Sequence, residues 1–296
     1  MKIITRIAFG MLVYVVLLWV AHRVPIAASL MLLFPALNGL GLFFEGDNAP
    51  EIARTMILLP LINGLLCAVY IWIFILAPSD IPTLKLTGFC ATMVVLLWLG
   101  SVLWVWWRRR NNKPTGVRDS HQLRFGLVWT VVLAAAAIVV SLYFDLYPPG
   151  ASQSQSTTSS WANPADIPRE LVEVAMGNLL KITLFFFGLL FFIVVSSHPR
   201  APAWLKGFMG GFPIVPFGGL ISLSSGQETA AVMGTLHQMA GSVWASPIVP
   251  LWFIMFVARY LALTRSVARH VLGLFVGWAG CLIAIAGISW LLLNLQ

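Results

Sequence analysis

The sequence predicts an all-α, polytopic membrane protein with about nine transmembrane helices, arranged as two inverted four-helix repeats joined by a linker helix. Three observations lead to this prediction. The 296 residues are 59% hydrophobic and only 9% charged, a composition whose apolar surface a soluble domain could not bury. A proline-containing apolar segment occurs twice, and basic residues gather in alternate loops between apolar stretches.

The duplicated segment is carried by two Phe-Pro pairs and by the residues that follow them. The pair ending at Pro35 matches the pair ending at Pro213 at an offset of 178 positions. Beyond the next loop, Glu51 matches Glu228 at an offset of 177, so one loop residue has been lost. Because a proline, a glutamate and several glycines keep register together, an internal duplication is favoured over chance similarity between apolar segments.

Nine apolar stretches are long enough to be membrane spans, and prolines interrupt the second, third, seventh and eighth of them. The N-terminal stretch is expected to be retained as a helix, because no small-residue cleavage pattern follows it. The predicted spans cover residues 4–20, 26–44, 51–76, 86–107, 125–144, 171–195, 204–223, 229–260 and 267–293.

These spans divide the chain into repeat one (1–107), a linking region (108–170) and repeat two (171–296). The linking region holds a basic loop, a linker helix and a Ser/Thr-rich loop. The positive-inside rule places the basic loop and the N-terminus in the cytoplasm, and the Ser/Thr-rich loop and the C-terminus outside. An odd number of crossings separates the repeats, so they are inverted whether the Phe-Pro segments are kinked spans or re-entrant hairpins.

Residues 1–107 resemble the GlpM-like family of small bacterial inner-membrane proteins. The resemblance is carried by Leu33-Phe34-Pro35, by Glu51-Ile52-Ala53-Arg54-Thr55 and by the Trp-rich end Trp98–Trp107. The second half keeps Gly211-Phe212-Pro213 but has Ala231 in the position of Arg54. The resemblance implies a fused, inverted pair of such units in a bacterial inner membrane. It supports the architecture rather than a particular chemistry.

Broken helices at matching places in inverted repeats are typical of transporter sites near the bilayer midplane. A proline frees a backbone carbonyl, which must then meet protein or water. Polar side chains inside apolar spans are few, and packing, helix capping or snorkelling would also account for each of them. Together the prolines and polar residues give the predicted substrate-binding site: Pro35, Asn38, Glu51, Arg54, Asn63, Lys181, Pro213, Glu228, His237 and Gln238.

The expected geometry brings the two Phe-Pro breaks together near the bilayer centre. Arg54 and Glu51 would lie at the cytoplasmic entrance to the site, and Glu228 at the external entrance. A membrane-embedded arginine needs an anion, so Arg54 points to an anionic or amphipathic substrate. Arg6, by contrast, is assigned to topology alone.

These features favour a secondary transporter or a lipid-carrier translocase that works by alternating access. A non-transporting accessory subunit of an envelope polysaccharide or lipid pathway is the alternative. An enzyme ranks lowest, because the sequence holds no catalytic motif and no paired metal ligands, and no cofactor is expected. Expected partners are membrane lipids, a small-molecule or lipid-linked substrate, and either a second copy of the chain or pathway proteins, but no nucleic acid.

Overall fold

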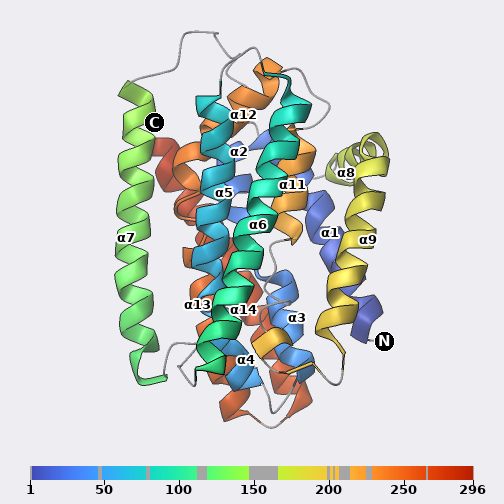
Figure 1. The fold of residues 1–296 in the computed structure, drawn as a ribbon, viewed down its shortest axis with the longest axis vertical. Helices are drawn as coiled ribbons and strands as arrows, with labels where there is room; N and C mark the ends of the chain where they lie inside the picture. Colours follow the sequence, from blue (N-terminus) through green and yellow to red (C-terminus); the bar gives the residue numbers. More distant parts are fainter. Residues whose placement is uncertain are drawn as a thin grey trace.

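The computed structural model describes residues 2–45, 49–77, 81–111, 119–146, 166–198, 201–202, 204–206, 214–224, 229–264 and 266–295. In this part of the chain every regular element is a helix, and most helices run along the long axis of one bundle (Figure 1). The prediction of an all-α protein is therefore confirmed.

The helices fall into two groups along the chain. The first group is α1 (Lys2–Arg23), α2 (Pro25–Met31), α3 (Ala36–Glu45), α4 (Ala49–Met56), α5 (Leu59–Leu76) and α6 (Thr83–Arg110). The second group is α7 (Asp119–Leu146), α8 (Ile167–Gly177), α9 (Leu179–Ser196), α11 (Ile214–Ser224), α12 (Thr229–Ser242), α13 (Ile248–Leu263) and α14 (Val267–Leu295).

Five apolar segments in the described chain are long enough to cross a bilayer on length and composition. They are Ile3–Ala21, Ile52–Leu76, Thr83–Arg108, His121–Tyr143 and Val267–Asn294. The pair α8–α9 would add a sixth, while α11 and α13 are apolar but shorter. These lengths and compositions fit a multi-pass membrane protein. The finer expectation of nine crossings stays a prediction.

Breaks lie near prolines in the second, third and eighth predicted stretches, whereas in the seventh Pro216 lies within α11 and Pro213 is outside the described residues. Between α2 and α3, the Phe34 N–H donates to the Met31 carbonyl at 2.9 Å, and the Gly39 N–H donates to the Pro35 carbonyl at 3.0 Å. Pro35 therefore ends one helix and starts the next, because its own nitrogen has no hydrogen to donate. Similar breaks separate α4 from α5 at residues 57–58, and α12 from α13 at residues 243–247.

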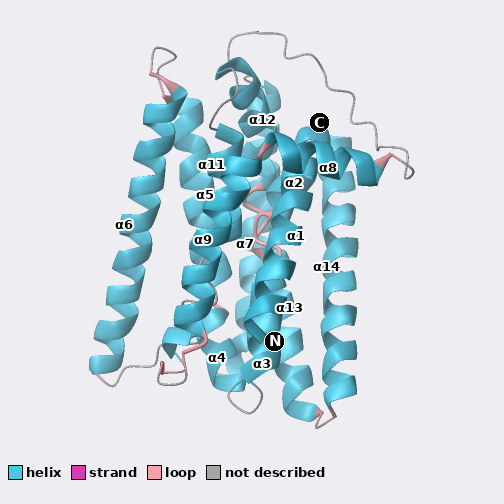
Figure 2. Cartoon of the chain, turned by 90° about the vertical axis from the view of Figure 1, so that its right-hand side faces the viewer, coloured by secondary structure: helices cyan, strands magenta, loops and turns pink. Residues whose placement is uncertain are grey.

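The predicted span 171–195 is wrong as a single straight helix. The chain bends by 81° at Asn178, between α8 and α9. The Asn178 side-chain amide donates to the Val174 carbonyl at 2.9 Å, which satisfies a carbonyl at the end of α8. Consequently α8 lies across the end of the bundle (Figure 2). Glu173 and Lys181, which one straight helix would place on roughly the same side, lie on two different helices.

An ion pair fastens α8 to the end of α1. Glu170 accepts a hydrogen bond from Trp19 Nε1 at 2.8 Å and pairs with the Arg23 guanidinium. On the outer side of α8, Val172 and Met176 are exposed beside an Arg169–Glu173 pair. An apolar stripe beside a charged one is the pattern of a helix that lies in a membrane interface.

The interior of the bundle is built around α1 and α12. The ring of Tyr14 on α1 stacks on Phe185 of α9 with 4.0 Å between ring centroids. Helix α12 packs against α2, α5 and α7. At the edge of the bundle, α7 exposes aliphatic side chains such as Val131 and Val139, as a helix facing lipid would (Figure 1).

Glycines permit the closest helix contacts. A Cβ atom added at Gly64 would lie 2.2 Å from Pro247 Cγ, and one at Gly241 would lie 2.1 Å from Ser141 Oγ. Small residues of this kind let backbones approach closely where hydrocarbon provides no hydrophobic drive for association.

Replacing Gly64 with Ala should destabilise the protein by about 1–3 kcal/mol, because the rigid Pro247 ring cannot make room for the methyl group. The midpoint of thermal unfolding in detergent measures this. The matched control is Gly88→Ala, since a Cβ there meets nothing within 4 Å. Equal midpoints for the two variants would contradict the close contact.

The two ends of the chain lie toward opposite ends of the bundle, and the basic end of α6 lies on the side of the N-terminus (Figures 1 and 2). In a variant without Cys67, Cys90 and Cys281, we expect Asn294→Cys to react with an impermeant thiol reagent in intact cells. Asn111→Cys should stay unlabelled, because the positive-inside rule places that end in the cytoplasm. The opposite labelling pattern would reverse the orientation.

Candidate functional site

Two helix breaks lie side by side inside the bundle: residues 32–35, between α2 and α3, and residues 243–247, between α12 and α13. On one side of the breaks, the hydroxyls of Ser29 and Ser242 are hydrogen-bonded to each other. On the other side, a Cβ added at Gly39 would lie 2.8 Å from the Phe253 ring. We name this pair of adjacent breaks the broken-helix seam.

The second break is a run of tight turns. The N–H groups of residues 244, 245, 246 and 248 each donate to the carbonyl three positions earlier, at 3.0–3.2 Å. Pro247 and Pro250 have no N–H to continue an α-helical pattern. The Ser246 hydroxyl also donates to the Val243 carbonyl at 2.7 Å, in place of the N–H that Pro247 lacks.

Neighbouring helices close the seam. The Trp278 Nε1 of α14 donates to the Pro35 carbonyl at 3.4 Å. Helix α5 brings Gly64 against Pro247, and the adjacent Asn63 is buried, with 6% of its surface exposed. The indole Nε1 of Trp244, inside the second break, is buried and has no hydrogen-bond partner among the described residues.

The electrostatics of the seam follow from the direction of its helices. Helices α2 and α12 end there, and α3 and α13 begin there. The first N–H groups of a helix carry a partial positive charge, and its last carbonyls a partial negative charge. Two helix starts and two helix ends therefore face the same region. The starts stabilise a negatively charged group, and the ends stabilise a positively charged one.

A second polar cluster joins α1, α9 and α11. The Lys181 ammonium donates to the Ser222 carbonyl at 2.8 Å, and the Tyr14 hydroxyl is hydrogen-bonded to the Ser222 hydroxyl. Further along α11, the Ser224 hydroxyl meets Tyr70 of α5 at 2.7 Å and Thr87 of α6 at 3.0 Å. Helix α11 is thus attached to three helices of the first half of the chain.

The structure brings some of the predicted site residues together and separates others. Pro35 and Asn63 lie at the seam, and Asn38 is half-buried one turn into α3. His237 and Gln238 are half-buried on α12, before Ser242. Lys181 belongs to the second cluster.

The other four predicted residues are exposed or lie partly or wholly outside the described part of the chain. Arg54 is exposed on α4. Glu51 lies in α4, but its side chain is outside the described part. Pro213 and Glu228 lie outside the described residues, so the meeting of the two Phe-Pro breaks stays a prediction. Among the described residues, the helix break that lies beside the break at Pro35 is the break that contains Pro247.

Arg6 is the residue that the sequence interpretation placed wrongly. Its side chain is buried, with 6% of its surface exposed. One guanidinium nitrogen donates to the Ser197 hydroxyl at 2.9 Å, and another lies 2.8 Å from where a Cβ of Gly41 would be. A residue assigned to topology alone therefore joins α1, α3 and the end of α9.

The seam also depends on Ser29, Ser242 and Ser246, which the sequence interpretation did not select. Their only signal is a hydroxyl inside an apolar segment, which is common in membrane helices. Among the described residues no group of three or more His, Cys, Asp or Glu side chains could hold a metal ion. The described cavity lies elsewhere, between α13 and α14, and none of the ten predicted residues lines it.

No protein-family model matches the chain, and comparisons with curated proteins and with solved structures find no match.

Replacing Arg6 with Gln should lower stability by about 1.5–3 kcal/mol, because hydrogen bonds made by a buried charged group are lost. Replacing the exposed Arg54 with Gln should change stability much less, because interactions of exposed charges contribute little in water. The yield of folded protein in membranes and its unfolding midpoint in detergent measure both. Ser197→Ala should reproduce part of the Arg6 effect, and a stable Arg6→Gln protein would refute the buried contact.

Proposed function

We propose that the chain is a secondary transporter or lipid-carrier translocase for an anionic or amphipathic substrate. One observation carries the proposal: two discontinuous helices, α2–α3 and α12–α13, break side by side within a bundle of apolar helices. Irregular backbone is tolerated at membrane depth only where protein surrounds it or where it lines a cavity. Paired breaks are the usual construction of a transporter's substrate site.

Two features of the seam suit an anionic group. The start of α3 carries the partial positive charge of a helix N-terminus, and Trp244 offers a buried indole N–H with no described partner. Nearby hydroxyls, such as that of Ser246, can donate or accept as the substrate requires. The Lys181 ammonium adds a positive charge in the neighbouring cluster on α11, which suits substrate binding or charge compensation during transport.

Alternating access would follow from inverted repeats. At the offset of 178 positions, α3 (Ala36–Glu45) corresponds to residues 214–223, which lie within α11 (Ile214–Ser224). The two helices lead toward opposite ends of the bundle (Figure 1), which supports the inversion. The next helices differ between the repeats, because the break between α4 and α5 corresponds in the sequence to the interior of α12. The proposed duplication therefore has diverged at its third helix.

A non-transporting accessory subunit of an envelope pathway is the second candidate. The observation that favours it is the tight packing of the seam, where Ser246 and Val243 are fully buried. A seam that stays packed passes no substrate. It would serve as a rigid part of a chain that binds a partner protein. Either role would place the chain in a bacterial inner membrane, with its N-terminus in the cytoplasm.

Cysteine accessibility at the seam separates the two candidates without knowledge of the substrate. In a variant lacking the three native cysteines, we expect Ser246→Cys to react with a small impermeant thiol reagent. Reaction from either side of the membrane is expected, because alternating access opens the same site to both sides in turn. Right-side-out and inside-out vesicles provide the two directions.

The matched control is Ala137→Cys, a small residue buried on α7 where that helix packs against α12. It should stay unreactive from both sides. If Ser246→Cys is equally unreactive from both sides in folded protein, the seam does not open and the accessory role is favoured.

A further inference from the structure

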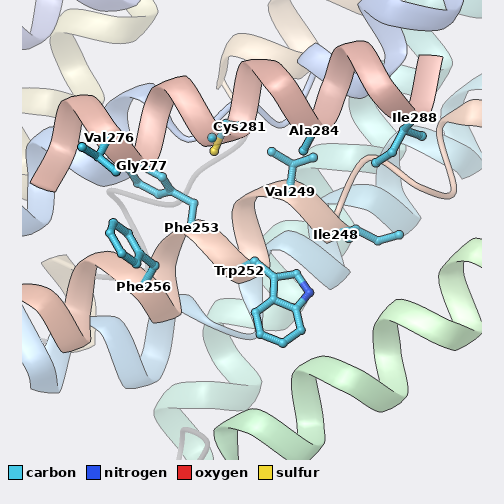
Figure 3. Close-up of a pocket in the computed structure, with 11 residues that line it drawn as sticks. Ile248, Val249, Trp252, Phe253, Phe256, Val276, Gly277, Cys281, Ala284 and Ile288 are labelled. Atoms are coloured by element: carbon cyan, nitrogen blue, oxygen red, sulfur yellow. The ribbon is translucent and has the colours of Figure 1, made fainter. Parts of the chain in front are cut away.

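A groove of about 380 Å³ runs between α13 and α14 (Figure 3). Its walls are almost entirely apolar, and Trp252, Phe256, Gly277, Gly280 and Ala284 are among the lining residues. The volume is near the lower end of the range of roughly 300–1,000 Å³ typical of ligand sites. One hydrocarbon chain suits a groove of this size and polarity.

The groove exists because large side chains on α13 face small ones on α14. Gly277, Gly280 and Ala284 follow at helical spacing along one face of α14. A Cβ added at Gly280 would meet nothing within 4 Å, so space beside this glycine is open. Helix α7 stands close to the groove, where Thr130 accepts a hydrogen bond from Trp252 Nε1 at 2.8 Å.

The groove opens to the outer surface of the bundle. At its mouth, Phe256 is 41% exposed and Val276 is 53% exposed. In a membrane this surface faces lipid, so the nearest available hydrocarbon chains belong to lipids of the bilayer.

One end of the groove is basic. The lining face of α13 continues from Phe256 to Arg259, and that of α14 continues from Val276 back to Arg269, two turns earlier. Both arginines are exposed, and neither forms an ion pair with a described acidic side chain. Between them, Tyr260 packs against Gly273, where an added Cβ would lie 2.3 Å from the ring. The apolar groove therefore ends at two positive charges.

We propose that this groove binds one anionic phospholipid, with an acyl chain between α13 and α14 and the phosphate headgroup at Arg259 and Arg269. Arginine pairs well with phosphate because its planar guanidinium donates two parallel hydrogen bonds. Basic positions at the cytoplasmic ends of transmembrane helices attract anionic headgroups. None of the seam residues 32–35 and 243–247 lines the groove, and the test of the proposal does not depend on transport.

Native mass spectrometry of the full chain, purified with equal amounts of phosphatidylglycerol and phosphatidylethanolamine of the same acyl chains, tests the proposal. We expect one phosphatidylglycerol to be retained in preference to phosphatidylethanolamine. Each arginine should contribute about a fivefold preference. The double variant Arg259→Gln, Arg269→Gln should therefore lose the preference while still retaining lipid.

A second pair of variants tests the groove itself. Gly280→Phe fills the open space and should reduce retention of both lipids. Gly287→Phe is the matched control, because it lies on the same helix, has equal space around it and does not line the groove. Equal retention by these two variants, or equal retention of the two lipids by the unaltered chain, would overturn the proposal.

Discussion

Backbone hydrogen bonding in the absence of water is the constraint on which this structure depends. A continuous helix satisfies its own N–H and carbonyl groups, but a broken helix leaves several of them for other partners. Here the breaks are placed against one another and supplied with hydroxyls and an indole: Ser29 and Ser242 bond across them, Ser246 bonds within one, and Trp278 reaches the Pro35 carbonyl. The breaks are costly features that the surrounding helices stabilise together, which is why they mark the candidate site.

Polar side chains connect distant parts of the sequence in the same way. Tyr14 reaches Ser222, and Arg6 reaches Ser197, so α1 is attached to α11 and to the end of α9. Each interhelical hydrogen bond in a membrane contributes on the order of 1 kcal/mol, so several of them are needed to fix one arrangement of helices. Apolar packing alone would hold the helices together with less specificity, because lipid competes equally well for apolar surfaces.

The sequence predicts those features that depend on local chemistry. The breaks near Pro35, Pro60 and Pro247 follow from the missing proline N–H, and the helical class follows from composition. The bend at Asn178 was missed because no proline marks it, although Gly177-Asn178 is a helix-stop signal. The burial of Arg6 was missed because its partner Ser197 is 191 positions away. The sequence could not predict that the two described breaks lie side by side, for the same reason. The hydrogen bond between Ser29 and Ser242 depends on the folded structure and not on their spacing along the chain.

Helix α13 connects the two sites that we describe. The Phe253 ring contacts Gly39 of α3 on the seam side, and it also lies against Gly277 at the groove. A movement of α13 that opens the seam must therefore move Phe253 and change the groove. A bound ligand shifts a conformational equilibrium only when it binds the two states with different affinity. A lipid in the groove would therefore influence the seam only as far as the position of Phe253 differs between the open and closed states.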